Sequence, residues 1–246
     1  MTKFFATVCL PPTRPRRLPG AIAAAMAPYD INGTEEWNPA GEWDWWIIHV
    51  PAESPYLVLP AHDGDRRLVT ASAVPRRKVD LAPLGPLECY GGPRGLLDLD
   101  AMRRRAVGQH DALSAAWDEL AALHPPARPL SEFLTRHESD PGGYPLAQAK
   151  EDHLLQPLVQ EVAQRAVAGD PHFDMSFLTT DPVAYFAGEH EARRQGALHT
   201  AVPGYALLTL DGSWWDADGD GYWERANAYL DDLGPEAVVV DVLCHC

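Results

Sequence analysis

The sequence predicts an α+β protein: a ferredoxin-like sandwich made of two strand–helix–strand units, with a helical insertion between its halves. Three observations support this fold class. Apolar strands flank a short helix near the N-terminus, the same order recurs near the C-terminus, and the residues between them show helical periodicity. We therefore expect residues 1–95 to form the N-terminal half of the sandwich with Pro/Gly-rich loops, 96–200 the insertion, and 201–246 the C-terminal half.

The N-terminal unit begins with KFFATVCL, a strand expected at residues 3–10. Two prolines follow it, and proline cannot donate to a strand ladder. A helix is expected at 19–28, because Pro19 suits a first helical position and apolar residues then recur at spacings of four and three. The aromatic segment GEWDWWIIHV closes the unit with a strand at 43–50. Short strands are also expected within 55–60 and 66–74.

The middle of the chain is expected to be helical. LLDLDAMRRRAVGQHDALSAAWDELAALHPP carries one apolar stripe, starts with acids that suit the positive end of a helix dipole, and stops at two prolines. A second helix should begin at Pro157 and end at Gly169. A third should begin at Asp181, a cap followed by a first-turn proline, and end near Gly196.

The C-terminal unit repeats the order of the first. YALLTL predicts a strand at 204–210, and a DG turn and a short hairpin arm at SWW follow it. A helix is expected at 222–232, with Gly234 and Pro235 as its stop, and AVVVDVLC predicts the last strand at 237–244. The four strands should pair in one mostly antiparallel sheet, and both helices should pack on a single face of that sheet.

The aromatic strand lacks a polar face. Strand alternation places Trp43, Trp45 and His49 on one side, and Trp46 with Asp44 on the other. Either the chain buries both faces, in which case all three tryptophans are core residues, or one face is a ligand or partner surface, with Trp46 as the exposed exception. The surface hypothesis also includes the second tryptophan pair, so its full residue set is Trp43, Asp44, Trp45, Trp46, His49, Trp214 and Trp215.

The segment DADGDGYWE is the sharpest metal-like pattern. Asp216, Asp218 and Asp220 match positions 1, 3 and 5 of a calcium loop, and Glu224 stands at position 9. Position 12 is asparagine, where calcium needs a bidentate glutamate. The alternative interpretation is an acidic turn in which Asp220 caps the following helix, and under that interpretation added calcium should not stabilise the protein.

Other catalytic patterns are weak. Cys244 and Cys246 share a strand face while His245 points away, and Cys9 should lie opposite residue 237 or 238, far from Cys244, so a three-cysteine metal site is not expected. Several histidines stand beside acids (RHESD, EDH, DPHFD, GEHE) without HExxH spacing. The chain has no GxSxG, GxGxxG or Walker A sequence, which argues against serine hydrolases and nucleotide-phosphate binding.

Charge and hydropathy exclude further classes. The formal net charge is −15, and residues 106–246 carry the whole excess, with 7 basic and 23 acidic side chains. This balance disfavours nucleic acid as a partner. No run of 18 apolar residues or signal-peptide pattern occurs, so we expect no membrane partner and a cytoplasmic protein.

Four segments together resemble an uncharacterised family of phage and prophage proteins that also occurs in high-GC actinobacteria. They are WNPAGEWDWW, GGPRGLLDLDAMR, YALLTLDGSWW and VDVLCHC. Members of that family carry a WDWY-type strand followed by Gly-Gly-Arg-Trp, a YAxxxxDGxW strand, and an end similar to Asp-Cys-His-Ile. This chain departs from the pattern twice: IIHVPAE follows Trp46, and Leu243 stands before Cys244 where the family has aspartate. The resemblance implies a mobile-element setting and no particular reaction.

Two functions follow as hypotheses. The first is a non-catalytic binding protein of phage or mobile-element type, without a cofactor, that recognises a host protein or a small ligand through its aromatic strand and acidic C-terminal portion. Such an acidic surface could mimic nucleic acid toward a basic partner. The alternative is a metal-assisted enzyme, in which Asp, Glu and His side chains of the DADGD loop and the helical insertion hold a divalent cation.

Overall fold

A computed structural model describes residues 3–33, 37–50, 55–70, 79–81, 84–173, 175–178, 180–188 and 190–246. Its packing divides the chain into two compact units. The sheet unit comprises residues 1–105 and 198–246, and the helical unit comprises residues 106–197. Within the described residues, no helix is both long enough and apolar enough to cross a membrane.

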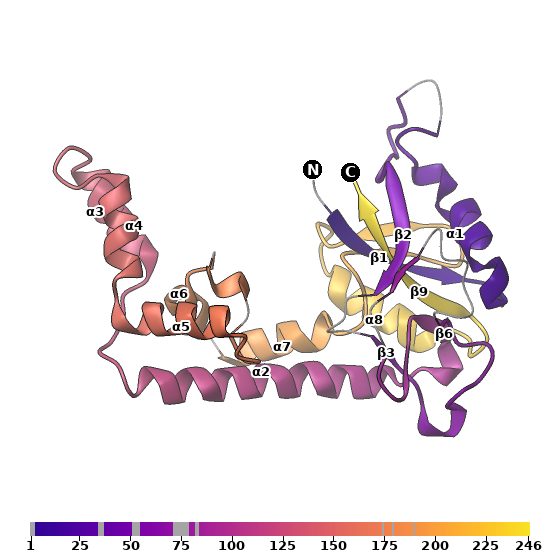
Figure 1. The fold of residues 1–246 in the computed structure, drawn as a ribbon. Helices are drawn as coiled ribbons and strands as arrows, with labels where there is room; N and C mark the ends of the chain where they lie inside the picture. The colour runs from indigo at the N-terminus through magenta and orange to yellow at the C-terminus, as the bar shows by residue number, and fades with distance from the viewer. Residues whose placement is uncertain are drawn as a thin grey trace. The chain divides into compact units, whose positions relative to one another are not determined.

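The sheet unit is built on one mixed sheet (Figure 1). Its strand order is β4-β2-β9-β1-β7-β8, and β6 also pairs with β9. The strands are β1 (Lys3–Leu10), β2 (Trp45–Val50), β4 (Val79–Leu81), β6 (Gly91–Pro93), β7 (Ala206–Leu208), β8 (Trp214–Asp216) and β9 (Val238–His245); β3 (Tyr56–Leu57) and β5 (Glu88–Cys89) form a separate pair. The prediction that the four long strand segments share one sheet is therefore confirmed.

The central strand β9 determines how the chain crosses the sheet. It runs antiparallel to both β1 and β2, while β1 is parallel to β7, and β7 is antiparallel to β8. It follows that β8 runs parallel to β9. The second strand–helix–strand unit therefore starts at β8, the segment expected to be only a hairpin arm, rather than at 204–210.

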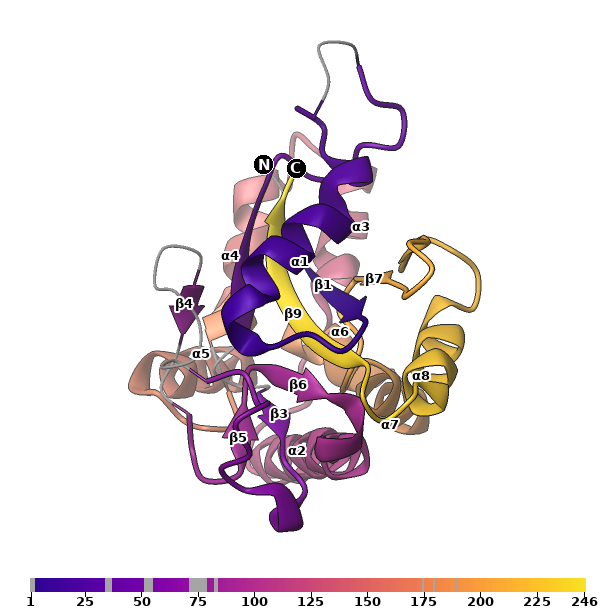
Figure 2. The same cartoon turned by 90° about the vertical axis from the view of Figure 1, so that its right-hand side faces the viewer.

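The two helices of the sheet unit lie on opposite faces, so the single-face prediction is wrong. Helix α1 (Leu18–Met26) packs with Val240 and Val242, whereas α8 (Tyr222–Asp232) packs with Val239. Figure 2 shows α1 lying across one face of the sheet. The reason is visible in VVVDV, which is apolar at nearly every position, because a strand buried on both faces needs cover on both. The protein is mixed α/β, and the specific ferredoxin-like sandwich is not confirmed.

Strand β6 approaches β9 closely enough to require glycine. Gly91 has a φ of +136°, and a Cβ added there would collide with the carbonyl oxygen of Val239. Both conditions favour a residue without a side chain. The GGP sequence therefore forms an added strand beside β9.

The helical unit contains most of the remaining helices. Helix α2 (Leu99–Ala121) starts in the sheet unit and continues into the helical one, and α3 (Leu130–Ser139), α4 (Leu146–Leu154), α5 (Pro157–Ala168), α6 (Pro182–Ala187) and α7 (His190–His199) follow. Short 3₁₀ turns cover Pro15–Arg17, Ala27–Tyr29, Pro60–His62, Arg94–Leu96 and Met175–Leu178. The helix expected from Asp181 to Gly196 is in fact two helices, α6 and α7. Asp181 caps α6, as predicted, by accepting hydrogen bonds from the backbone nitrogens of Val183 and Ala184.

Candidate functional site

One end of the sheet brings together the two ends of the chain and the aromatic segment. Lys3 and Trp45 both lie opposite His245 in the strand register, and Figure 1 shows the start of β1 and the end of β9 side by side there. The Asp44 carboxylate lies 2.6 Å from Nδ1 of His245, and the Asp44 backbone nitrogen donates to the His245 carbonyl at 2.9 Å. Asp44 of WDWW and His245 of CHC, which are 201 residues apart, therefore form one polar pair.

The three tryptophans of the aromatic segment have different environments. Trp43 and Trp46 are 6% and 3% exposed and belong to the core beneath α1, but Trp45 is 47% exposed. The expectation that all three are buried is wrong for Trp45, and the exposed exception is not Trp46. Regular pairing of β2 begins only at Trp45, and Trp43 forms an isolated bridge with Asp30, so strand alternation does not extend back to Trp43.

His49, also predicted for this surface, lies in β2 by its backbone, but its side chain is outside the described part of the structure.

The second tryptophan pair is engaged within the sheet unit. The Trp214 ring contacts Tyr29 at a centroid distance of 5.1 Å, and it also packs edge-on against Phe4. Trp215 packs against Tyr229 on the other face, and the Arg225 guanidinium lies 5.5 Å from its ring centroid. Both side chains are partly buried, so they support the sheet end more than they present a surface.

Carboxylates gather at the same sheet end. Burial raises the pKa of Glu42, and the nearby charge of Asp216 raises it further. The exposed Tyr205 hydroxyl donates a hydrogen bond to Asp218, and this bond is the first cause of a raised Tyr205 pKa. Within the described residues, no ion pair includes Glu42, Asp216 or Asp218. These groups and the polar pair define a strand-end surface, comprising Glu42, Asp44, Trp45, Tyr205, Asp216, Asp218 and His245.

The acidic loop is a turn whose helix cap differs from the prediction. Gly221, with a left-handed φ of 63°, occupies the N-cap of α8, and no side chain caps the helix, so the capping role predicted for Asp220 is wrong. Asp216 accepts a hydrogen bond from the backbone nitrogen of Asp218, and Glu224 lies 3.7 Å from His199. Among the described residues, Asp216, Asp218, Asp220 and Glu224 do not form a three-ligand cluster. Calcium binding by this loop stays a prediction.

The cysteines do not converge. Cys9 lies opposite Val239, one residue beyond the predicted register, and it packs in the core beneath α8, whereas Cys244 packs beneath α1. Burial raises the pKa of Cys244 to about 12 and also raises that of Cys9. Cys246 is exposed. Two thiols on opposite faces of a sheet cannot share a metal ion, which agrees with the expectation that this is not a three-cysteine site.

A buried acid that sequence analysis did not single out lies in the middle of β9. Asp241 is 7% exposed and accepts hydrogen bonds from the Thr7 hydroxyl at 2.7 Å and the Tyr56 hydroxyl at 2.8 Å. Burial raises its pKa to about 6, although both hydrogen bonds lower it. The only sequence signal is a lone aspartate within VVVDV. The Thr7 oxygen also accepts from the Gly204 nitrogen, so Asp241 in β9 is linked to β1, to β3 and, through Thr7, to the segment before β7.

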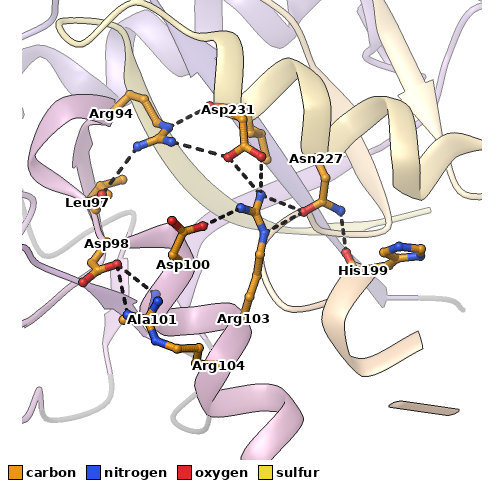
Figure 3. A network of polar contacts seen from close by, with 11 residues as sticks. Arg94, Leu97, Asp98, Asp100, Ala101, Arg103, Arg104, His199, Asn227 and Asp231 are labelled. Carbon is orange, nitrogen blue, oxygen red and sulfur yellow. Dashed lines mark hydrogen bonds and ion pairs between the residues drawn. The ribbon is translucent and has the colours of Figure 1, made fainter. Parts of the chain in front are cut away.

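A second polar network holds the start of α2 against α8 (Figure 3). The Arg103 guanidinium donates to the side-chain oxygens of Asn227 and Asp231 at 3.0 Å each, and it also pairs with Asp100. Arg94 donates to the Leu230 carbonyl and pairs with Asp231. Because these charges satisfy one another, we interpret the network as a structural clamp within the sheet unit.

The histidines noted beside acids all lie in the helical unit, and most have a single partner. His137 contacts the Tyr144 carbonyl, His153 contacts Asp181, and His172 contacts Asp170. His190 differs, because a second histidine and an aspartate lie beside it.

Comparisons of the chain with protein-family models, curated proteins and solved structures gave no match. The strand-end surface therefore has to be interpreted from its own chemistry.

Proposed function

We propose that this chain is a non-catalytic binding protein that recognises a basic segment of a partner protein through the strand-end surface. The observation that carries the proposal is the exposed Trp45 indole beside the Asp44 carboxylate, at a sheet end whose other acids have no ion pair among the described residues. Lysine and arginine side chains fit both features, because aromatic faces and carboxylates attract cations.

The charge distribution supports a basic partner. Residues 198–246 contain nine acidic side chains and one basic one. Glu42 and Asp216 are like charges close enough to raise the pKa of Glu42, and a bound cation would relieve that repulsion. A field of one sign also attracts an oppositely charged partner before contact.

The environment of Asp241, a carboxylate with a strongly raised pKa, favours a binding protein over an enzyme. The pKa of Asp241 is raised to about 6, a value that would suit a general acid, but the group is enclosed and hydrogen-bonded to Thr7 and Tyr56. A substrate would have to displace those hydroxyl groups to reach it. Asp241 therefore supports a role in the core of the sheet.

The setting of the partner comes from the resemblance alone. A protein of phage or mobile-element type would meet the basic proteins of a host cell, and an acidic aromatic surface would compete with nucleic acid for such a protein. This part of the proposal is separable from the surface chemistry, which can be tested with a synthetic probe.

The test uses a fluorescent peptide of alternating lysine and arginine residues separated by glycine, titrated with the full chain. We expect binding that weakens as salt is added, because exposed charges are screened. Trp45→Ala and Asp44→Asn should each weaken it about tenfold, which corresponds to roughly 1.4 kcal/mol of lost interaction.

Matched controls distinguish binding at the strand-end surface from non-specific attraction of the peptide to acidic or exposed aromatic side chains elsewhere. Trp37→Ala removes a tryptophan that is 81% exposed but lies outside the defined surface, and Asp232→Asn removes an exposed acid of α8. Both control variants should bind the peptide as the unmodified chain does. Equal loss in the surface and control variants, or no loss in any of them, would overturn the proposal.

A further inference from the structure

A compact group of metal-ligand side chains lies in the helical unit, away from the strand-end surface. His110 and Asp111 are consecutive residues of α2, and His190 is the first residue of α7. One ligand atom from each lies within 4.8 Å of the other two. The two imidazole rings are 5.1 Å apart at their centroids, and Nε2 of His190 lies 3.8 Å from Oδ1 of Asp111.

The buried histidine of the group is held in place by its surroundings. His110 is 7% exposed, so packing fixes the position of its ring. An imidazole binds metal through a ring nitrogen whose lone pair is free. The His110 ring also hydrogen-bonds the backbone of His190, a contact of the kind that orients metal-bound histidines.

The carboxylate has an oxygen that lacks a hydrogen-bond donor. Oδ1 of Asp111 is a buried atom with no hydrogen-bond partner among the described residues. It does lie 3.3 Å from Nε of Arg194, in an ion pair whose partners are both partly exposed. Arg194 is therefore the competitor of any cation at Asp111, and it has room to move because 38% of its side chain is exposed.

We propose that His110, Asp111 and His190 bind a divalent transition-metal ion, with Zn²⁺ as the best match. Two imidazoles and one carboxylate are the ligand set of many three-ligand zinc sites, and water completes the tetrahedron. Calcium and magnesium prefer oxygen ligands and fit this set poorly. An ion bound here links the start of α7 to α2 within the helical unit. The site shares no residue with the strand-end surface, so this inference does not depend on the proposed function.

The experiment is a Zn²⁺ titration of the metal-free full chain by calorimetry, with a parallel Co²⁺ titration followed by visible absorption. Both are carried out in a Cys246→Ser background, because the exposed Cys246 thiol could itself bind Zn²⁺. We expect one ion per chain and a raised melting temperature, since a ligand that binds only the folded state stabilises it.

Three variants locate the site. His190→Gln and Asp111→Asn should weaken Zn²⁺ binding at least about tenfold, because changing even the residues that orient metal ligands costs about 10–100-fold in affinity. Arg194→Gln should strengthen it, because the competing guanidinium is gone. A structural ion pair between Arg194 and Asp111 without a metal would give no such gain.

The matched control is His172→Gln. His172 is also an exposed histidine beside an aspartate, with Nδ1 3.3 Å from Asp170, but the described residues place no third ligand there. Binding should be unchanged in this variant. The proposal is overturned if Zn²⁺ does not bind at micromolar concentration, or if binding is equal in the His190, Asp111 and His172 variants.

Discussion

Two His–Asp pairs, one in each unit, have the same composition but different surroundings. In the sheet unit, Asp44 is bonded to His245 at a partly exposed strand end. In the helical unit, Asp181 lies 3.2 Å from Nε2 of His153, and both side chains are largely buried. The contrast lies in how many donors each carboxylate satisfies.

Asp181 is a saturated acceptor. Its Oδ1 accepts from the first turn of α6 and contacts His153, and its Oδ2 accepts from the Leu130 nitrogen at 2.6 Å. The His153 ring in turn packs edge-on against Phe133. Among the described residues, the Asp44 side chain has a hydrogen bond to His245 alone, and Asp44 precedes the exposed Trp45 in the chain. A carboxylate whose two oxygens both accept hydrogen bonds from the fold helps to hold that fold together. A carboxylate at the surface with fewer donors can still accept hydrogen bonds from a partner.

The largest expected effect concerns the residues that follow Asp44. Trp46→Ala should destabilise the sheet unit by about 3–5 kcal/mol, the range for large aromatic side chains removed from a core, because Trp46 is buried beneath α1. Trp45→Ala should cost less than about 1 kcal/mol, as surface substitutions do. Hydrogen exchange of the β9 amides measures both. Similar losses in the two variants would contradict the assignment of Trp45 to a surface.

The pairs themselves can be separated by removing each aspartate. Asp181→Ala deletes the α6 cap and leaves the Leu130 and His153 donors without an acceptor, so we expect a loss of about 3 kcal/mol. Asp44→Ala should cost less than about 1 kcal/mol, as exposed ion pairs do. Hydrogen exchange in α4–α6 and in β9 reports the two units separately. A large loss on removing Asp44 would make that pair structural as well.

Asp241 extends the comparison to an acid held by hydroxyl groups instead of a histidine. Its folded pKa of about 6 exceeds its ordinary value of 3.8, so the folded state holds the proton more tightly than the unfolded state. The resulting stabilisation is complete below pH 4 and is lost as the pH rises through 6, a change of up to about 3 kcal/mol.

Asp241→Asn is neutral at every pH and can still accept a hydrogen bond. The stability of the wild type relative to this variant should therefore fall between pH 4 and pH 7, as measured by urea unfolding at each pH. The difference between the two proteins cancels the titration of all other groups. A flat difference would show that the carboxyl of Asp241 is not perturbed.

These pairs also show which parts of the structure could be predicted from the sequence. Periodicity and the Pro and Gly stops predicted β1 and α8 at their observed bounds, and they predicted β2, β9 and α1 within two residues at each end. The sequence of α8 does not show on which face of the sheet it packs; the signal is in β9, where VVVDV is apolar on both faces and therefore needs a helix on each. The Asp44–His245 contact depends on strand register, which pairs residues 201 positions apart.

The candidate sites were only partly predictable for the same reason. Composition marks the aromatic segment, but strand alternation does not hold through it. A bend at Asp44 and an isolated bridge at Trp43 interrupt the alternation, so Trp43 is buried while Trp45, expected on the same face, is exposed. The sequence marks His190, the first residue of α7, only as a histidine beside acids. His110 and Asp111 precede it by 80 and 79 residues, and tertiary packing brings the three together.

The smallest expected effect is at the acidic loop, where we predict that calcium changes nothing. The Asp216 carboxylate already accepts a hydrogen bond from the Asp218 backbone nitrogen, and Glu224 lies beside His199. Position 12 holds Asn227, whose side-chain amide is hydrogen-bonded to Arg103 and to the backbone of α8. A bidentate ligand is therefore missing, and the residue in its place is occupied. Millimolar calcium should leave the melting temperature unchanged, both in the wild type and in Asp218→Ala. A rise seen only in the wild type would mean that these carboxylates rearrange around the ion, and the loop would then join the Zn²⁺ site proposed in the helical unit as a second place where this chain holds a cation.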